Sequence, residues 1–145
     1  MMNEIMMNEI DNKTLKELEE ISQKIYTKLG SGHSEFIYHR ALEIELRNKG
    51  IKYETEKKVI ITYVADDGIS YSLGEERIDI YIYQQDYQII VELKAIIGVP
   101  RETELAQMYK YGRELPTAKY GIIINFPQAG VKIANDKIHF IVIEY

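Results

Sequence analysis

Two predicted strands on either side of residues 84–87 constrain the fold of this chain more than any other part of its sequence. From Arg77 to Tyr83 isoleucine stands at every second position, which is the side-chain period of a β-strand with one apolar face. The segment Gln88 to Ala95 is a second apolar strand, and the polar residues between the two are typical of a turn. The pattern therefore predicts an antiparallel hairpin.

The turn also determines which residues of the two strands face each other. A two-residue turn, or a four-residue loop with the same centre, pairs Ile80 with Val91. This register is favoured because it places the apolar residues of both strands on one face of the sheet. On that face we expect Ile78, Ile80 and Ile82 of the first strand and Leu93 of the second.

On the opposite face the same register brings two carboxylates together. Asp79 lies opposite Glu92, at a Cβ separation of about 4.5–5.5 Å where like charges repel. A divalent cation removes that repulsion, and oxygen ligands of this kind suit Mg²⁺. Lys94 lies one step further along the same edge. The spacing alone leaves two interpretations open, a cation site and a solvated row of charged side chains.

The remaining segments predict an α/β chain of the α+β type, with a mixed β-sheet flanked by helices. The second predicted helix should bury Ala41, Leu42 and Leu46 together with Phe36 or Ile37. The other predicted elements are helices over residues 11–29, 34–48 and 102–115, strands over 59–64, 69–73 and 120–125, a turn at 66–68, and a last hairpin that joins Ile133 to the strand 137–145 across residues 135–136.

Composition limits the classes of protein to which the chain can belong. Its 145 residues predict a single domain over residues 11–145, preceded by a disordered or frayed repeat of MMNEI in residues 1–10. The absence of cysteine rules out disulfides and thiol chemistry and fits a cytoplasmic protein, and no apolar run is long enough for a membrane span. The net charge of −5 argues against a protein that coats nucleic acid by charge alone.

Two motifs in the chain resemble those of a known family. Asp79 followed by Glu92-Leu93-Lys94 resembles the D…(D/E)-x-K signature of the PD-(D/E)XK nuclease superfamily. The segment Gly32 to Tyr38 reads G-x-x-E-x-x-Y, the motif of the GxxExxY family within that superfamily. The resemblance implies a restriction-endonuclease-like core and extends over roughly residues 15–130. It continues in family order through residues 41–46, 74–79, 91–95, 106–108 and 121–126.

The resemblance also implies roles for individual residues. Asp79 and Glu92, with Glu35 as an additional acidic residue, would hold Mg²⁺, for which Mn²⁺ can substitute. Lys94 would position or activate the attacking water. Gln107 matches the helix residue that contacts the site in the exonuclease-like branch, and the residues that would face the substrate are Gly32, His33, Tyr38, Arg77 and Tyr111.

Read from the residues alone, several of these positions have structural alternatives. Glu35 in a first helical turn can simply complement the helix dipole. Tyr38, one turn later, fits a packing residue that orients Glu35, and His33 fits an exposed side chain. Gln107 on an amphipathic helix fits a solvated residue.

The function that this resemblance implies is a Mg²⁺-dependent nuclease that hydrolyses phosphodiester bonds in DNA, with RNA as an open second substrate. The alternative is a catalytically silent nuclease fold that binds nucleic acid or serves as an adaptor. Because one domain of this size offers little surface for holding a duplex, a third possibility is a homodimer that processes DNA junctions or ends.

Overall fold

A computed structural model describes residues 3–5, 12–129 and 137–145 of the chain, and of residues 3–5 only the backbone. The described strands form one six-stranded sheet in the order β1-β6-β5-β4-β3-β2. Only β4 and β5 run parallel, and the other neighbouring strands run antiparallel. The elements are β1 (Asn3–Ile5), α1 (Lys13–Leu29), α2 (Glu35–Asn48), β2 (Tyr53–Val64), β3 (Ser70–Tyr83), β4 (Gln88–Lys94), α3 (Glu102–Glu114), β5 (Ala118–Asn125) and β6 (His139–Glu144).

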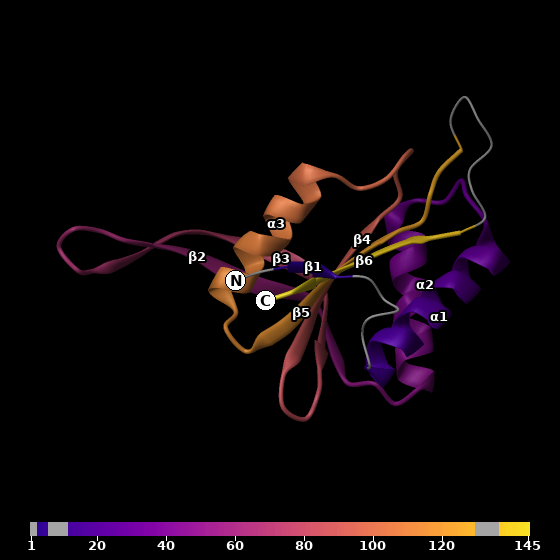
Figure 1. Ribbon diagram of the computed structural model, residues 1–145, viewed down its shortest axis with the longest axis horizontal. Helices are drawn as coiled ribbons and strands as arrows, with labels where there is room; N and C mark the ends of the chain where they lie inside the picture. The colour runs from indigo at the N-terminus through magenta and orange to yellow at the C-terminus, as the bar shows by residue number, and fades with distance from the viewer. Residues whose placement is uncertain (1–2, 6–11, 130–136) are drawn as a thin grey trace.

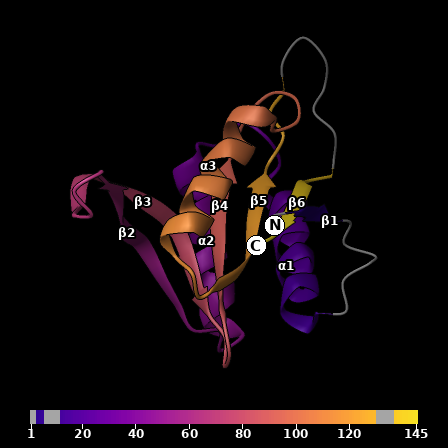
Figure 2. The same cartoon turned by 60° about the vertical axis from the view of Figure 1, so that its left-hand side comes forward.

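The helices cover both faces of the sheet, which confirms the predicted α+β class. Figures 1 and 2 show α1 and α2 against one face and α3 against the other. Because parallel strands need a crossover connection, α3 spans the sheet between the end of β4 and the start of β5. No helix among the described residues is both long and apolar enough to span a membrane.

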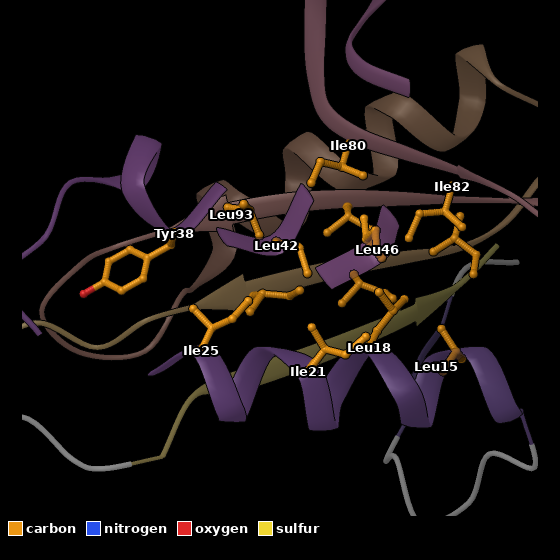
Figure 3. Packing of buried hydrophobic residues seen from close by; sticks show 14 of the residues in the cluster. Leu15, Leu18, Ile21, Ile25, Tyr38, Leu42, Leu46, Ile80, Ile82 and Leu93 are labelled. Atoms are coloured by element: carbon orange, nitrogen blue, oxygen red, sulfur yellow. The ribbon is translucent and has the colours of Figure 1, made fainter. Parts of the chain in front are cut away.

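The larger part of the core lies between the sheet and the pair α1 and α2. Figure 3 shows leucine and isoleucine side chains of both helices pointing at the sheet. Leu15, Leu18, Leu42 and Leu46 have no exposed surface. Their spacing of three or four residues is the helical period that the sequence displays.

A second cluster lies under α3, and it includes one residue that the prediction placed elsewhere. Ile80 and Ile82 pack under α1 and α2 as predicted, but Ile78 packs under α3 with Met108. The cause is an irregularity between β2 and β3. Glu56 has a positive φ of 54°. Thr55 and Lys57 on either side of it pair with residues of β3, but Glu56 itself forms no ladder pair. The strand therefore turns over between Ile78 and Ile80.

The β3–β4 register agrees with the prediction. Ile80 pairs with Val91 and Tyr83 with Gln88, across the turn at residues 84–87. Leu93 and Val91 belong to the cluster under α1 and α2, on the face opposite to Ile90. Because the side-chain period of a strand is two, this register decides which face receives Glu92.

Several predicted boundaries and burials differ from the structure. β2 begins at Tyr53, six residues before the predicted strand, and β3 continues through Gly74 as one strand with a register shift opposite Ile61 and Thr62. Phe36 is 64% exposed and Ile37 is 40% exposed, and Tyr38 takes the buried position instead.

The two ends of the chain test the remaining predictions only in part. The predicted last hairpin falls on Ile133 and residues 135–136, which lie outside the described residues, although its second strand is present as β6. The expectation for residues 1–10 also lies largely outside them, and within it Asn3–Ile5 pairs with β6.

Replacing Leu42 with alanine is expected to lower the free energy of unfolding by about 2–5 kcal/mol, because it opens a cavity between α2 and the sheet. Ile44→Ala on the same helix is the matched control, since Ile44 is 49% exposed. Urea unfolding of both variants measures the difference, and equal losses would contradict the described packing of α2.

Candidate active site

The predicted carboxylate pair lies where β3 and β4 separate. The ladder between the two strands ends at Ile80 and Val91. Beyond that point each strand bonds to a side chain of the other. The N–H of Asp79 donates to Glu92 Oε1 at 3.0 Å, and the N–H of Leu93 donates to Asp79 Oδ2 at 2.8 Å. The two carboxylates thus take the places of backbone carbonyls and face each other across the opening.

Burial makes this pair electrostatically costly. Glu92 is only 5% exposed. Burial, and then the negative charge of Asp79, raise the pKa of Glu92 to about 8. Burial also raises the pKa of Asp79, against the stabilising hydrogen bond from the N–H of Leu93. Two carboxyl groups that resist ionisation side by side are typical of a site that a cation completes.

Glu35 and Lys94 approach the pair from two other elements. Glu35 is the first residue of α2 and Lys94 the last of β4. Burial raises the pKa of Glu35, and the charge of Asp79 raises it further. The positive charge of Lys94 lowers the pKa of all three carboxyl groups. Its ammonium group is therefore close to Glu35, Asp79 and Glu92. The structure brings these four predicted residues together.

The turn before α2 determines where Glu35 lies. Gly32 adopts a positive φ of 102°, a conformation that L side chains rarely take. Its N–H donates to Gln128 Oε1 at 2.7 Å. Tyr38 stacks on Phe126 with ring centroids 4.3 Å apart, and its hydroxyl donates to the carbonyl of Gly30 at 2.6 Å. These contacts tie the start of α2 to the segment that follows β5.

Three residues predicted to face a substrate belong to this supporting structure. Gly32 and Tyr38 make the contacts just described. His33 Nε2 lies 3.2 Å from the carbonyl of Leu29, and its ring meets Tyr38 edge to face at 5.8 Å between centroids. In the described part of the chain the contacts of these residues are with the helix ends and with residues 126–128. The contacts of Tyr38 therefore fit the role of a packing residue, which the sequence offers as the alternative to substrate binding.

Gln107, Tyr111 and Arg77 meet on the α3 side of the sheet. Gln107 Nε2 donates to the hydroxyl of Tyr111 at 2.9 Å, and that hydroxyl lies 3.5 Å from the carbonyl of Arg77. Burial raises the pKa of Tyr111, and the charge of Glu92 raises it further. Tyr111 thus stands next to the carboxylates, with Gln107 one helical turn before it.

His39 and Glu56 form a further cluster with Asp79 that the sequence interpretation missed. One ligand atom from each of the three lies within 4.8 Å of the others. His39 follows Glu35 by four residues on α2, so helical spacing offered a signal for it. Glu56 offered none, because its position depends on the irregular backbone of β2.

The donor atoms fit a divalent cation. One oxygen of Asp79 and one of Glu92 accept a backbone N–H, and within the described residues the second oxygen of each has no hydrogen-bond partner. Carboxylate oxygens of this kind are the ligands of Mg²⁺, and an imidazole at His39 adds a nitrogen that Mn²⁺ also accepts.

Two cavities lined by described residues lie outside this site. A shallow cavity of about 410 Å³ on the outer side of α3 is lined by Gln107 together with Lys110 and Arg113. A larger one of about 770 Å³ lies between α1 and β6 and contains none of the predicted site residues. The carboxylates therefore lie where β3 and β4 separate, and Lys110 and Arg113 are the basic residues of α3 that line the smaller cavity.

Comparison with protein families agrees with this geometry. The family described as the PD-(D/E)XK nuclease superfamily matches residues 12–136, most of the chain. The chain belongs to the PD-(D/E)XK nuclease superfamily. Members of this superfamily are generally metal-dependent nucleases that use divalent ions such as Mg²⁺. The superfamily resemblance of the sequence is thereby confirmed.

Solved structures resemble the chain in fold. The crystal structure of SSO0001 matches with a TM-score of 0.52 and 24% identity over 74% of this chain and 48% of that one. A protein of unknown function, AF1548, matches with a TM-score of 0.40 and 12% identity over 65% of this chain and 47% of that one. The chain thus spans about half the length of either protein. No curated protein matches it.

Proposed function

We propose that this PD-(D/E)XK protein is a Mg²⁺-dependent nuclease that hydrolyses phosphodiester bonds in DNA. The observation that carries the proposal is the pair of hydrogen bonds from the N–H groups of Asp79 and Leu93 to the carboxylates of Glu92 and Asp79. These bonds hold the two carboxylates close together, within the influence of Lys94, and leave one oxygen of each without a hydrogen bond among the described residues. The motif from Gly32 to Tyr38 supports a place in the GxxExxY family. We further propose that residues 11–145 act as one domain in the cytoplasm.

The proposed roles follow from the charges at the site. Asp79 and Glu92 hold the cation, and Glu35 completes its oxygen ligands or accepts a proton from the attacking water. A bound divalent cation supplies Lewis-acid stabilisation of the charge that grows on the phosphate and helps to generate the nucleophile. Lys94 brings a compact positive charge to the water or to the phosphate.

Gln107 and Tyr111 belong to α3 and form the border of the proposed site on that side of the sheet. A hydrogen bond joins the Gln107 amide to the hydroxyl of Tyr111, and we propose that this amide contacts the reacting group. Arg77 is exposed on β3, and its carbonyl accepts from Tyr111. Since Glu76 and Ile78 face α3, the guanidinium lies on the other side of the strand, and we propose that it meets a phosphate of the substrate there. Gly32, His33 and Tyr38 hold the start of α2, so we propose that they serve the substrate through the position of Glu35.

Cleavage assays test the proposed activity. We expect the purified protein to cut single-stranded or duplex DNA when Mg²⁺ or Mn²⁺ is present and to stop when the metal is chelated. RNA of the same sequence is assayed beside DNA to establish the substrate. Failure to cut any of these substrates with either metal would contradict the proposal.

The ligand set is tested by metal binding. Glu92→Gln is expected to weaken Mn²⁺ binding by at least tenfold in calorimetry, because it removes a buried negative charge from the proposed ligands. His39→Ala is expected to weaken it less than Glu92→Gln does, because the proposed ligand set consists of Asp79, Glu92 and Glu35 and leaves His39 outside it. A larger loss of Mn²⁺ affinity in His39→Ala than in Glu92→Gln would indicate that the cation binds to the cluster of His39, Glu56 and Asp79 instead.

The second candidate function is a catalytically silent nuclease fold that binds nucleic acid or acts as an adaptor. The acidic net charge of −5 favours the adaptor form of this candidate, because a negative surface weakens contact with phosphates. Nucleic-acid binding that survives both chelation and Asp79→Ala, without cleavage, would support this candidate. Retention of both acidic residues and of Lys94 favours the enzyme.

A further inference from the structure

The outer parts of β2 and β3 form a hairpin arm, residues 59–73. Its inner end contacts α3, where Val59 is buried and the hydroxyl of Thr62 donates to Glu114 Oε2 at 3.3 Å. Figure 1 shows this arm projecting from the body of the molecule to a loop far from α1 and α2. The arm carries apolar side chains that are 43% to 66% exposed, namely Ile60, Tyr63, Val64, Ile69, Tyr71 and Leu73. A chain with so many large apolar groups on one projecting element is typical of a protein that buries them against a partner.

The arm also ends the sheet. β2 is the last strand in the sheet order, and among the described strands none pairs with its outer edge. From Val59 to Val64 this edge contains no charge, glycine or proline. At the register shift in the arm, the residue without a partner is Leu73, which belongs to β3. The β2 strand has no extra residue there, so its outer edge continues without interruption. An apolar edge strand without such protection is a template for pairing with another strand.

We propose that β2 pairs antiparallel with β2 of a second copy of this chain. Antiparallel pairing of a strand with itself is related by a twofold axis, and with Thr62 at the axis Ile60 faces the partner's Val64. The same register brings Lys57 and Lys58 to the end of the partner's β2, near Asp66 and Asp67 of its turn. Lys57 and Lys58 also form ion pairs with Glu54 and Glu75 of their own chain, at 3.7 Å and 3.1 Å, which the contact with the partner would extend. Each contact occurs twice across the axis, so the pairing joins opposite charges at both ends of an apolar centre.

Charge favours a second copy over nucleic acid as the partner of the arm. The only charged residues between Val59 and Leu73 are Asp66 and Asp67, at the turn. Both are exposed, and their carboxylates would repel a phosphate backbone. The lysines that complement them belong to the same strand, at Lys57 and Lys58, which makes the edge complementary to itself.

The dimer would join the two sheets into one. A twofold axis normal to the sheet keeps α1 and α2 of both copies on the same side, so the two candidate active sites open towards one face. Glu56, at the border of the site, lies six residues from Thr62 along β2, which corresponds to about 20 Å. Combined with the proposed function, this arrangement sets two cleavage sites roughly 40 Å apart.

A single cysteine tests the register directly, because the chain has no cysteine of its own. Residues opposite each other in an antiparallel pair have Cα atoms about 4.5–5.5 Å apart, which a disulfide can bridge. Thr62→Cys is therefore expected to form a covalent dimer on mild oxidation. The matched control is Thr103→Cys on α3, which is also exposed and lies outside β2, and which should dimerise like the wild type without forming a covalent bond.

Charge reversal tests the pairing of lysine with aspartate. Sedimentation of the wild type at tens of micromolar should give about twice the monomer mass of 16.9 kDa. The double variant Lys57→Asp/Lys58→Asp and the double variant Asp66→Lys/Asp67→Lys should each dimerise at least tenfold more weakly. An equimolar mixture of the two should form a heterodimer, because the reversed charges again complement each other.

Two results would overturn the proposal. The first is a monomeric wild type at these concentrations together with equal oxidation of Thr62→Cys and Thr103→Cys. The second is a monomer whose arm binds duplex DNA, shown by loss of DNA binding in Val64→Asp. Both readouts concern assembly rather than cleavage, so a failure of the dimer is distinguishable from a failure of the proposed nuclease activity.

Discussion

Replacing Lys94 with alanine is expected to lower the rate of phosphodiester cleavage by about 10²–10³-fold. Lys94 brings a positive charge to a site that otherwise contains the carboxylates of Glu35, Asp79 and Glu92, whose pKa values it lowers. Its removal takes away the protein group best placed to meet the negative charge that develops on the phosphate. Single-turnover cleavage of a labelled DNA strand with saturating Mg²⁺ measures the effect.

The control for this prediction is Lys16→Ala, a substitution of an exposed lysine on α1 that removes the same charge elsewhere. Thermal unfolding of both variants verifies that they remain folded. Cleavage by Lys94→Ala at the rate of Lys16→Ala would show that Lys94 takes no part in the reaction. Asp79→Ala should lose activity at least as completely, because it removes a proposed ligand of the cation.

Replacing Glu92 with glutamine is expected to stabilise the metal-free protein near pH 8 by an amount on the order of 3 kcal/mol. The pKa of Glu92 is about 8 in the folded protein, above the ordinary glutamate value of 4.5. Between these two pH values the folded state holds a proton that the unfolded state has released. The wild type therefore loses stability as the pH rises through this window, and glutamine, which does not ionise, avoids the loss.

Urea unfolding from pH 5 to pH 9 in the presence of a chelator measures this difference. Glu20→Gln on the exposed side of α1 is the control and should follow the wild-type curve. Mg²⁺ should restore the stability of the wild type near pH 8 and leave Glu92→Gln unchanged, because the cation binds only when Glu92 is ionised. Parallel curves for the wild type and Glu92→Gln would contradict the burial and coupling of the carboxylate pair.

The sequence predicted the centre of this fold well for a physical reason. Alternation with a period of two, combined with a short turn, leaves few registers that bury the apolar faces of both strands. The register pairing Ile80 with Val91 is confirmed, and it was enough to bring Asp79 and Glu92 close together. The α2 helix was equally predictable, because Ser34 and Gly50 enclose a helical pattern.

The details of the site depended on interactions that no local pattern reveals. Asp79 and Glu92 do not form a regular ladder pair, because each carboxylate accepts the backbone N–H that a carbonyl would otherwise bind. The approach of Glu56 depends on a positive φ in β2, and its sequence neighbours carry no turn signal. A backbone irregularity of this kind is decided by how two strands pack together.

Burial on α2 was mispredicted because apolar residues are common on protein surfaces. Phe36 and Ile37 fit the helical stripe, yet both are exposed while Tyr38 is buried. Its stacking on Phe126 and the bond from its hydroxyl to the carbonyl of Gly30 satisfy both the ring and the polar group. Phe126 is far away in the sequence, and Gly30 lies in the turn before α2. The helical period alone therefore could not identify Tyr38 as the buried residue.

The central claim is that Asp79 and Glu92 together hold a divalent cation between β3 and β4. Anomalous diffraction from crystals of the protein grown with Mn²⁺ above pH 8 tests it most directly, because it locates the metal without reference to activity. We predict an anomalous peak within bonding distance of a carboxylate oxygen of both Asp79 and Glu92. A fully occupied peak bound to His39 and Glu56 without Glu92, or the absence of any peak at these carboxylates, would contradict the claim.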